Sequence, residues 1–558
     1  MTHLWDVLTA AVGERTTLYL PWHDETEYHL GKLVERAEWS AGQVVAELGG
    51  RVPRRLGVLM GNGEPWVRAV FTTLRLDASV VPLPLPAGLS AAEAYVARLA
   101  RTVTAADLDA ILVDRSVGVR VIEAVDAAVG VPLIDISEPD RMRPPDCELT
   151  GARPAVIQFT SGSTSAPKGV VLSHDNVIAG LSAITDGLGW VDSDVFGLWL
   201  PLFHDMGLFS TLCALARGSS VCLWRPTDFL RRPVDWLRGF AASPSTVLAA
   251  PNFFYDYMVR AAGSQPLDGI DLSGWRLACN GAEPVQRRTL VAFEEVFGPY
   301  GLRDTVLNPV YGMAEATLIV TGPDPASRWR SVYVDRDHLA PGERIAVVAD
   351  DAPEARALVA CGGPAPGIRL RIADEAIPLD DGVVGEVQIT GPSVTAGYLD
   401  LPAEAQPYTS DGWLRTGDLG FRHDGQLHIV GRRKDMVTVR GQNYYAEDVE
   451  EVVRSAAGAD GRRVVAIPWT DSEKTGADDL AGEWMVVLWE TSAPQENAVA
   501  TAEVLRQAVV RTLGLDAVRV VPVRPSTIPH TSSGKVRRSA ARRQCLDGDL
   551  LVQNERKS

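Results

Sequence analysis

The most informative stretch of the sequence is Thr160-Ser161-Gly162-Ser163-Thr164-Ser165-Ala166-Pro167-Lys168-Gly169, which combines hydroxyl side chains, glycine and a single lysine. It follows an apolar, strand-like run at 155–159. Glycine lets the backbone fold closely around a polyanion, and N–H groups, hydroxyls and an ammonium then donate to its oxygens. The stretch therefore predicts a phosphate-binding loop, although a polar hairpin turn fits the same residues. It is not a Walker A loop, because glycine follows the lysine where that motif has Ser or Thr, and another strand-like run comes next.

Lysine is scarce in this chain, with six residues, so arginine carries nearly all of the positive charge. A lysine offers a compact, mobile point charge that the planar guanidinium of arginine does not imitate. Three of the six lie in segments typical of binding sites, namely Lys168, Lys434 and Lys535. These three are candidate functional residues, and chance placement on the surface remains open for the others.

Composition limits the class of protein. The chain has 558 residues and is 46% hydrophobic, so we expect more than one core and two or three domains. A formal net charge of −17 opposes a nucleic acid or an anionic membrane as the main partner. The six cysteines contain no C-x-x-C pair, which argues against a zinc site or a disulfide framework and suits a reducing cytoplasm. No apolar run approaches the roughly 18 residues of a membrane span, so we expect a cytoplasmic protein that is not integral to a membrane.

Strand-like and helix-like segments alternate along most of the chain. Short β-rich runs at 55–60, 110–113 and 246–250 are separated by helix-length stretches such as 30–48 and 91–105. This alternation predicts layered α/β units with largely parallel sheets.

The remainder of the chain shows two changes of character. The acidic region 322–366, interrupted by Pro and Gly, indicates an insertion or a change of subdomain. Farther on, Gly431-Arg432-Arg433-Lys434-Asp435 is a charged break between two strand-like runs and predicts a linker able to rotate. We predict a large N-terminal domain over 1–431, a hinge over 432–436 and a small, mobile α+β C-terminal domain over 437–558.

Five motifs follow one another along the chain: the loop at 160–169, Tyr311-Gly312-Met313-Ala314-Glu315, Thr416-Gly417-Asp418, the break at 431–435, and Ser533-Gly534-Lys535. In this order they resemble the motif series of the adenylate-forming superfamily, which includes acyl-CoA synthetases, peptide-synthetase adenylation domains and luciferases. The resemblance covers nearly the whole chain and implies an α/β acyl-adenylate synthetase fold.

Finer details resemble the fatty acyl-AMP ligases of that superfamily. Residues 199–208 (WLPLFHDMGL) are similar to the ligase signature LPLYHDMGL, 311–317 (YGMAEAT) to YGLAEAT, and 439–450 (VRGQNYYAEDVE) to VRGRNHYPQDIE. The region 328–364 resembles an insertion that leans against the C-terminal domain of these ligases and disfavours the use of CoA. The resemblance implies that a carboxylic acid is joined to AMP with release of pyrophosphate. The acyl group would then pass to an acyl carrier protein or to a carrier domain of a polyketide or peptide synthetase.

The resemblance also implies how ATP is bound. Mg²⁺ would be anchored through Glu315 and Thr164, because hard oxygen ligands suit that ion. Tyr311 would offer a flat face to adenine, and Asp418 would accept both ribose hydroxyls; a core aromatic and a turn aspartate are the plainer alternatives. The residues implied for ATP and AMP are Thr160, Ser161, Gly162, Ser163, Thr164, Lys168, Gly281, Ala282, Glu283, Tyr311, Gly312, Met313, Ala314, Asp418 and Arg432.

Joining a carboxylate to the α-phosphorus of ATP brings two anions together, so like-charge repulsion is the obstacle. Lys535 would enter from the small domain, lie between the two anions and offset their charge, which makes it the main catalytic candidate beside Glu315 and His204. His204 would lie next to the carboxylate, although a lone histidine in an apolar run also suits a core position. The residues implied for the acyl pocket are Phe203, Asp205, Met206, Ser210 and Phe253, with Phe254; core packing explains the two phenylalanines nearly as well.

One departure from the family pattern bears on the substrate. Phe209-Ser210-Thr211 stands where the family often carries Ile-Gly-Gly. The extra volume and the hydroxyls would narrow or polarise a nearby acyl tunnel. We therefore expect a medium-length or functionalised acid instead of a plain long fatty acid.

The second half-reaction would follow a reorientation of the small domain about Asp435, after which Gly441 would line the surface for the thiol. Carrier proteins are typically acidic, so arginines of the small domain are docking candidates, namely Arg462, Arg463, Arg537, Arg538, Arg542 and Arg543. Two alternatives remain open: an acyl-CoA synthetase that uses free CoA, and a silent module that binds nucleotides or acyl adenylates. Lys535, Glu315 and Asp418 are all intact, which argues against the silent module.

Overall fold

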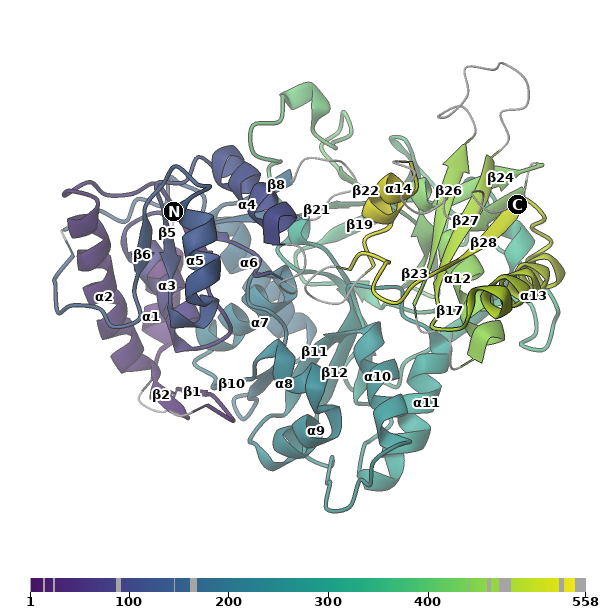
Figure 1. Ribbon diagram of the computed structural model, residues 1–558, viewed down its shortest axis with the longest axis horizontal. Coiled ribbons are helices and arrows are strands. Elements are labelled where there is room, and N and C mark those ends of the chain that lie inside the picture. The colour runs from purple at the N-terminus through teal and green to yellow at the C-terminus, as the bar shows by residue number, and fades with distance from the viewer. Residues whose placement is uncertain are drawn as a thin grey trace.

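The computed structural model describes residues 2–13, 16–23, 26–86, 92–144, 146–160, 168–440, 442–458, 463–470, 483–530 and 536–546. Two sheets with helices on their faces form the N-terminal part, an antiparallel sheet follows, and a smaller unit of strands and helices forms the C-terminal part (Figure 1). This arrangement confirms the predicted α/β class. Within these ranges no helix is long and apolar enough to cross a lipid bilayer.

The first sheet has six strands in the order β6-β5-β3-β4-β7-β8 and is parallel except for its last pair. Short apolar strands are expected where a parallel sheet is covered on both faces. The strands are β3 (Arg55–Leu59), β4 (Ser79–Pro82), β5 (Ala110–Val113), β6 (Leu133–Asp135), β7 (Val156–Thr160) and β8 (Lys168–Leu172). The helices of this half are α2 (Leu30–Glu47), α3 (Glu64–Arg75), α4 (Ala92–Ala106) and α5 (Val119–Asp126).

The second sheet has seven strands in the order β13-β12-β11-β9-β10-β1-β2, and only the pair β1–β2 is antiparallel. Its strands are β1 (Thr17–Tyr19), β2 (Glu27–His29), β9 (Phe196–Leu198), β10 (Val221–Leu223), β11 (Val247–Pro251), β12 (Leu277–Gly281) and β13 (Leu307–Pro309). Its helices are α1 (Leu4–Ala11), α6 (His174–Gly187), α7 (Asp205–Ala216), α8 (Pro226–Arg231), α9 (Pro233–Ala242), α10 (Asn252–Ala262) and α11 (Arg287–Phe297).

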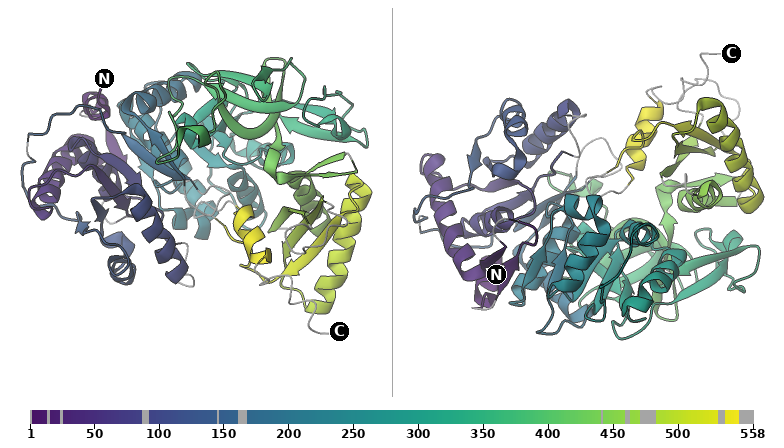
Figure 2. Two further views of the ribbon diagram at one scale, coloured as in Figure 1. Left: turned by 90° about the horizontal axis from the view of Figure 1, so that it is seen from above. Right: turned by 60° about the horizontal axis from the view of Figure 1, so that its bottom comes forward.

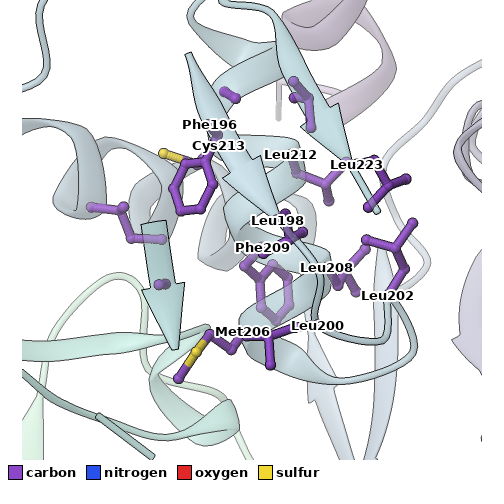
Figure 3. Packing of buried hydrophobic residues seen from close by; sticks show 14 of the residues in the cluster. Phe196, Leu198, Leu200, Leu202, Met206, Leu208, Phe209, Leu212, Cys213 and Leu223 are labelled. Carbon is purple, nitrogen blue, oxygen red and sulfur yellow. The ribbon is translucent and has the colours of Figure 1, made fainter. Parts of the chain in front are cut away.

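Local sequence explains how two of these helices are placed. Ser173 and Asn176 form a reciprocal capping box that fixes the start of α6. Helix α7 is apolar around its whole circumference, and ten of its twelve residues are buried. A helix without a polar face packs on all sides, so α7 forms part of the main core, as its close-up shows (Figure 3).

Antiparallel strands follow the second sheet. Three short strands pair in the order β14 (Tyr311–Gly312), β15 (Ile319–Gly322), β18 (Gly363–Pro364). A five-stranded sheet then pairs in the order β20 (Ile377–Pro378), β19 (Arg369–Asp374), β21 (Gly385–Thr390), β22 (Leu414–His423), β23 (Gln426–Arg432).

The C-terminal part begins after a single 3-10 turn at Arg433–Asp435. It contains the hairpin β24 (Met436–Val439) and β25 (Gln442–Tyr445), a sheet of β26 (Val464–Thr470), β27 (Glu483–Glu490) and β28 (Val518–Val523), and helices α12 (Ala446–Ala457), α13 (Gln495–Leu513) and α14 (Arg538–Leu546). Its apolar residues form cores of their own, and the views in Figure 2 show it as a distinct lobe.

The insertion predicted near 328–364 forms a hairpin of β16 (Ser331–Asp335) and β17 (Ala355–Val359). It contacts the C-terminal part at several points: Arg336 donates to the Thr512 carbonyl at 2.8 Å, and Tyr445 donates to the Leu339 carbonyl at 2.7 Å. Gln442 also hydrogen bonds to Asp337. The insertion therefore leans against the small lobe, as the sequence suggested.

Two buried histidines and an aspartate join the N-terminal helix to both sheets. The Nε2 atom of His3 lies 3.1 Å from Asp77, and the His3 and His174 rings are tilted by 37° with their centres 4.0 Å apart. The Nδ1 atoms of both histidines accept backbone N–H groups, from Trp5 and Leu4. Each ring therefore keeps its proton on Nε2 and has no lone pair left for a metal ion, although the three side chains have ligand-like spacing.

Candidate active site

One cleft of about 2500 Å³ lies between the large N-terminal part and the small lobe. It gathers described residues that sequence reasoning had named from far-apart motifs: Thr160, Lys168, Phe203, His204, Asp205, Met206, Ser210, Phe253, Ala282, Glu283, Tyr311, Gly312, Met313, Ala314, Glu315, Asp418, Arg432 and Asp435. Gly281 is buried and does not line the cleft. Ser161, Gly162, Ser163, Thr164 and Lys535, with Gly441 and Arg462, lie outside the described residues.

The predicted phosphate loop connects two paired strands. Thr160 ends β7 and is the register partner of Lys168, which begins β8. The Lys168 ammonium lies 5.2 Å from the centre of the Tyr398 ring, a cation–π distance. The pairing therefore fixes both ends of the loop at the cleft and places a positive charge beside it.

Tyr311, Asp418 and Arg432 form a connected group on one wall. The Tyr311 hydroxyl donates to one oxygen of Asp418 at 2.7 Å, and the Arg432 guanidinium lies 2.8 Å from the other. The nearby Asp418 carboxylate raises the pKa of Arg432, and burial raises the pKa of Tyr311. A carboxylate has about four lone-pair sites, so Asp418 keeps acceptor capacity for a ligand that enters the cleft.

Glu315 is the second carboxylate of the cleft. The Tyr398 hydroxyl donates to its Oε1 at 2.6 Å, and the backbone of Thr395 donates to its carbonyl at 2.8 Å. Burial raises the pKa of Glu315, with Asp205 adding a like charge. A nearby cation would stabilise the ionised form of this buried carboxylate, and its hard oxygens suit Mg²⁺. Sequence reasoning missed Tyr398, because no pattern distinguishes it from the other tyrosines.

Close backbone packing explains why glycine occupies positions 281 and 312 beside Tyr311. A Cβ atom on Gly312 would lie 2.0 Å from the Leu318 carbonyl oxygen, and one on Gly281 would lie 2.8 Å from that of Val310. Ala282 adopts a φ of 64°, a conformation rare for side-chain-bearing residues. Glu283 accepts the backbone N–H of Phe253 at 3.0 Å and so joins this wall to α10.

The acyl side of the cleft is built around the start of α7. His204 directly precedes the helix, and Gln158 donates to the Phe203 carbonyl at 3.0 Å, which fixes this turn. Of the two phenylalanines assigned to the tunnel, Phe253 lines the cleft. Phe254 does not, because it is fully buried among aromatic rings of the core.

Asp435, the predicted hinge residue, belongs to a largely buried ionic cluster. Arg538, the first residue of α14, lies 2.8 Å from Asp435, 2.7 Å from Glu450 and 3.4 Å from Glu447. Burial raises the pKa of Glu447 to about 7. The proposal that Arg538 docks a carrier protein is therefore wrong, since only 18% of its side chain is exposed and its charge is already paired.

Residues 10–399 match the family of AMP-binding enzymes. The chain belongs to that family. A long-chain-fatty-acid–AMP ligase, FadD26 of Mycobacterium marinum, is 34% identical over 74% of this chain and 73% of its own length. A 4-hydroxyphenylalkanoate adenylyltransferase of Mycobacterium tuberculosis is 33% identical over 87% of this chain and 81% of its own.

Two further relatives complete the comparison. The medium-chain-fatty-acid–[acyl-carrier-protein] ligase JamA of Moorena producens is 34% identical over 71% of this AMP-binding enzyme and 68% of its own length. A solved structure from a study of fatty acyl-adenylate ligases of E. coli and L. pneumophila aligns with a TM-score of 0.87, 28% identity and 98% coverage of both chains. The resemblance to adenylate-forming enzymes and to fatty acyl-AMP ligases is thereby confirmed.

Proposed function

We propose that this enzyme joins a carboxylic acid to the α-phosphate of ATP, releases pyrophosphate, and then transfers the acyl group to the phosphopantetheine thiol of a carrier protein. One observation carries the proposal: a single cleft combines the Tyr311–Asp418–Arg432 group, the Glu315 carboxylate and the apolar region beside α7. The nucleotide and the acid would thus meet within one enclosed site.

The nucleotide end would bind adenosine and then phosphate. Asp418 would accept the ribose hydroxyls with its free lone pairs, held in place by Tyr311 and Arg432. The ring of Tyr311 would face adenine opposite the backbone at Ala282 and Glu283, and Lys168 would neutralise charge on the outgoing phosphates.

Glu315 is the described residue best suited to hold Mg²⁺. The bound ion would lower the negative charge of the phosphate oxygens. Thr164 stays a proposed second ligand, and the Tyr398 hydroxyl would orient the Glu315 carboxylate for this task.

Activation of the acid would depend on Lys535 and His204. Lys535 would lie between the carboxylate and the α-phosphate and offset their repulsion, and His204 would orient the carboxylate from the start of α7. The small lobe would then rotate about Asp435 to admit the thiol. The boundaries 1–431, 432–436 and 437–558 are part of this proposal.

Two observations favour a carrier protein over CoA as the acceptor. The insertion already holds the small lobe through Arg336, Leu339 and Gln442, which restricts its rotation. In addition, JamA is named for ligation to an acyl carrier protein. All six cysteines are free thiols, which suits a reducing compartment, and we propose the cytoplasm.

The test is ATP–pyrophosphate exchange with an acid library, followed by transfer assays with a phosphopantetheinylated carrier protein and with free CoA. We expect exchange that requires Mg²⁺ and an acid, and acyl transfer to the carrier alone. Lys535→Ala should lower exchange about 100-fold or more while nucleotide binding persists. Abundant acyl-CoA would identify an acyl-CoA synthetase instead, and nucleotide binding without any exchange would identify a silent module.

A further inference from the structure

The acyl chamber runs along one side of α7 and ends within two helical turns. Met206 and Ser210 line it, whereas Cys213 and Ala214, about one turn farther, are fully buried in the core. Phe196, Leu188 and Ile184 also line the cleft in this region. In Figure 3, Phe196 lies beside Cys213, and Met206 lies at the opposite end of the packed group. The seven helical steps from residue 206 to residue 213 span about 10 Å, which is an upper limit on the depth of the chamber along α7.

Ser210 is the polar exception in this apolar chamber. It is 2% exposed, lines the cleft, and has no hydrogen-bond partner among the described residues. Its neighbour Thr211 is also buried, but the Thr211 hydroxyl donates to the Gly207 carbonyl at 2.9 Å. An unpaired buried hydroxyl is unfavourable unless a ligand or water satisfies it. The contrast between the two adjacent hydroxyls marks Ser210 as the one available to a substrate.

A second polar side chain without a hydrogen-bond partner lies on β13 of the second sheet. Asn308 on β13 is fully buried, and neither its amide nitrogen nor its amide oxygen has a partner within the described part of the chain. Asn308 is the register partner of Cys279 on β12, so the two side chains lie on the same face. Cys279 lines the cleft. Asn308 itself does not line the cleft, so this unsatisfied group lies behind the wall that Cys279 forms.

We infer that the acid is of medium length and carries a hydroxyl or keto oxygen part-way along its chain, and that Ser210 recognises this oxygen. The inference rests on the proposed function and adds its substrate class. Ser210 follows Met206 by four residues, so its hydroxyl lies about 6 Å deeper along the helix. No residue of α7 beyond Ser210 lines the cleft, which disfavours long chains. A plain alkyl chain would leave the hydroxyl unpaired, whereas an oxygen at that depth would satisfy it.

The experiment measures kcat/KM in ATP–pyrophosphate exchange with the full chain. The acids are octanoate and eight-carbon acids with one hydroxyl or keto group moved stepwise along the chain. We expect one substituted acid to exceed octanoate about tenfold or more, because a site with an unpaired polar group disfavours the analogue that lacks its partner. Palmitate should be a poor substrate.

Two variants assign the preference to Ser210. Ser210→Ala should bring the ratio between substituted acid and octanoate close to one, mainly by lowering the value for the substituted acid. Thr211→Val removes the adjacent hydroxyl, which is already bonded within the helix, and should leave the ratio unchanged. Ser210→Cys, close to serine in size and a weaker hydrogen-bonding group, should give an intermediate ratio, and it provides a second test if the alanine variant folds poorly.

The outcomes separate the two proposals. If octanoate or palmitate is the best acid, or if Ser210→Ala leaves the ratio unchanged, the substrate inference is wrong while adenylate formation stands. If no acid supports exchange by the wild-type enzyme, the proposed function fails and the inference fails with it.

Discussion

Two ionic clusters lie on either side of the predicted hinge and have opposite compositions. On the N-terminal side, one carboxylate, Asp418, meets one guanidinium, Arg432, and one hydroxyl, Tyr311. On the C-terminal side, one guanidinium, Arg538, meets three carboxylates, one of which, Glu450, also pairs with Arg454, so carboxylates outnumber guanidiniums by three to two. The first cluster is balanced and the second carries excess negative charge, although residues of both clusters line the cleft.

The first cluster is suited to binding a ligand, whereas the second is suited to stabilising the fold. Asp418 has one partner at each oxygen and keeps lone pairs for a ligand. The Arg538 guanidinium donates hydrogen bonds to Asp435, Glu450 and the Ala466 carbonyl, so few of its N–H groups remain to bind a ligand. We therefore expect changes in the first cluster to act on substrate kinetics and changes in the second to act on stability.

The largest effect is expected from Arg538→Leu. Removing the guanidinium leaves Asp435 and Glu447 without their ion-pair partner and Glu450 with Arg454 alone, which should lower the free energy of unfolding by about 3–5 kcal/mol. Urea denaturation measures this loss. Arg537→Leu is the matched control, because Arg537 has no carboxylate partner among the described residues, and it should cost less than about 1 kcal/mol. Equal losses in the two variants would refute the structural role of the cluster.

The next effect depends on pH and concerns Glu447. Its folded pKa of about 7 lies above the ordinary value of 4.5, so the folded state holds this proton more tightly than the unfolded chain does. The contribution of Glu447 to the free energy of unfolding is therefore most favourable below pH 4.5. It falls as pH rises from 4.5 through 7. Glu447→Gln should gain stability over the wild type with rising pH, by up to about 3 kcal/mol above pH 7.

Urea unfolding at pH 5 and pH 8 tests this shift. The exposed residue Glu404 provides the control, since Glu404→Gln should give the same difference from wild type at both pH values. A pH-independent difference for Glu447→Gln would show that its carboxyl does not titrate in this range.

A smaller effect, confined to kinetics, is expected from Asp418→Asn. The amide loses the charge-assisted bonds to Arg432 and to the ribose, so kcat/KM for ATP should fall about 10- to 100-fold while KM for the acid stays constant. Wild type should discriminate strongly against 3′-deoxy-ATP and the variant weakly. Strong discrimination by both proteins would mean that Asp418 does not contact the ribose.

The smallest effect is expected from Tyr311→Phe. This change keeps the aromatic face and removes only the hydroxyl that donates to Asp418, a bond worth about 1 kcal/mol. We expect about a fivefold rise in KM for ATP in exchange assays. A loss as large as that of Asp418→Asn would mean that the hydroxyl, and not the carboxylate, dominates recognition.

The sequence predicted the nucleotide end well, because short motifs carry its chemistry. Tyr311 and Asp418 are 107 residues apart, yet each lies in a local pattern with a recognisable role, and the structure brings them to 2.7 Å. Lys168 and Thr160 were likewise readable from one loop. The sequence did not indicate which charged side chains are buried. Arg538 resembled a surface charge until its contact with Asp435, 103 residues away, was seen.

The acyl end could be predicted only in part. The residues at 209–211 indicated a narrowed or polarised tunnel, but not which of them faces it. Phe209 is core, the Thr211 hydroxyl bonds within its own helix, and Ser210 alone of the three lines the chamber. Such orientation depends on how α7 packs against distant strands, which no local pattern records.

Arg356 of the insertion contacts the chain on both sides of the predicted hinge. Its guanidinium donates to the Val430 carbonyl before residue 435 and pairs with Asp448 beyond it, at 2.9 and 2.7 Å. A swing of the small lobe about residue 435 therefore has to break one of these bonds. In the proposed cycle, separating that ion pair would add to the activation barrier between the two half-reactions. Because the pair is partly buried, salt should screen it weakly, so stopped-flow measurements at low and high salt should show little change in the interconversion rate.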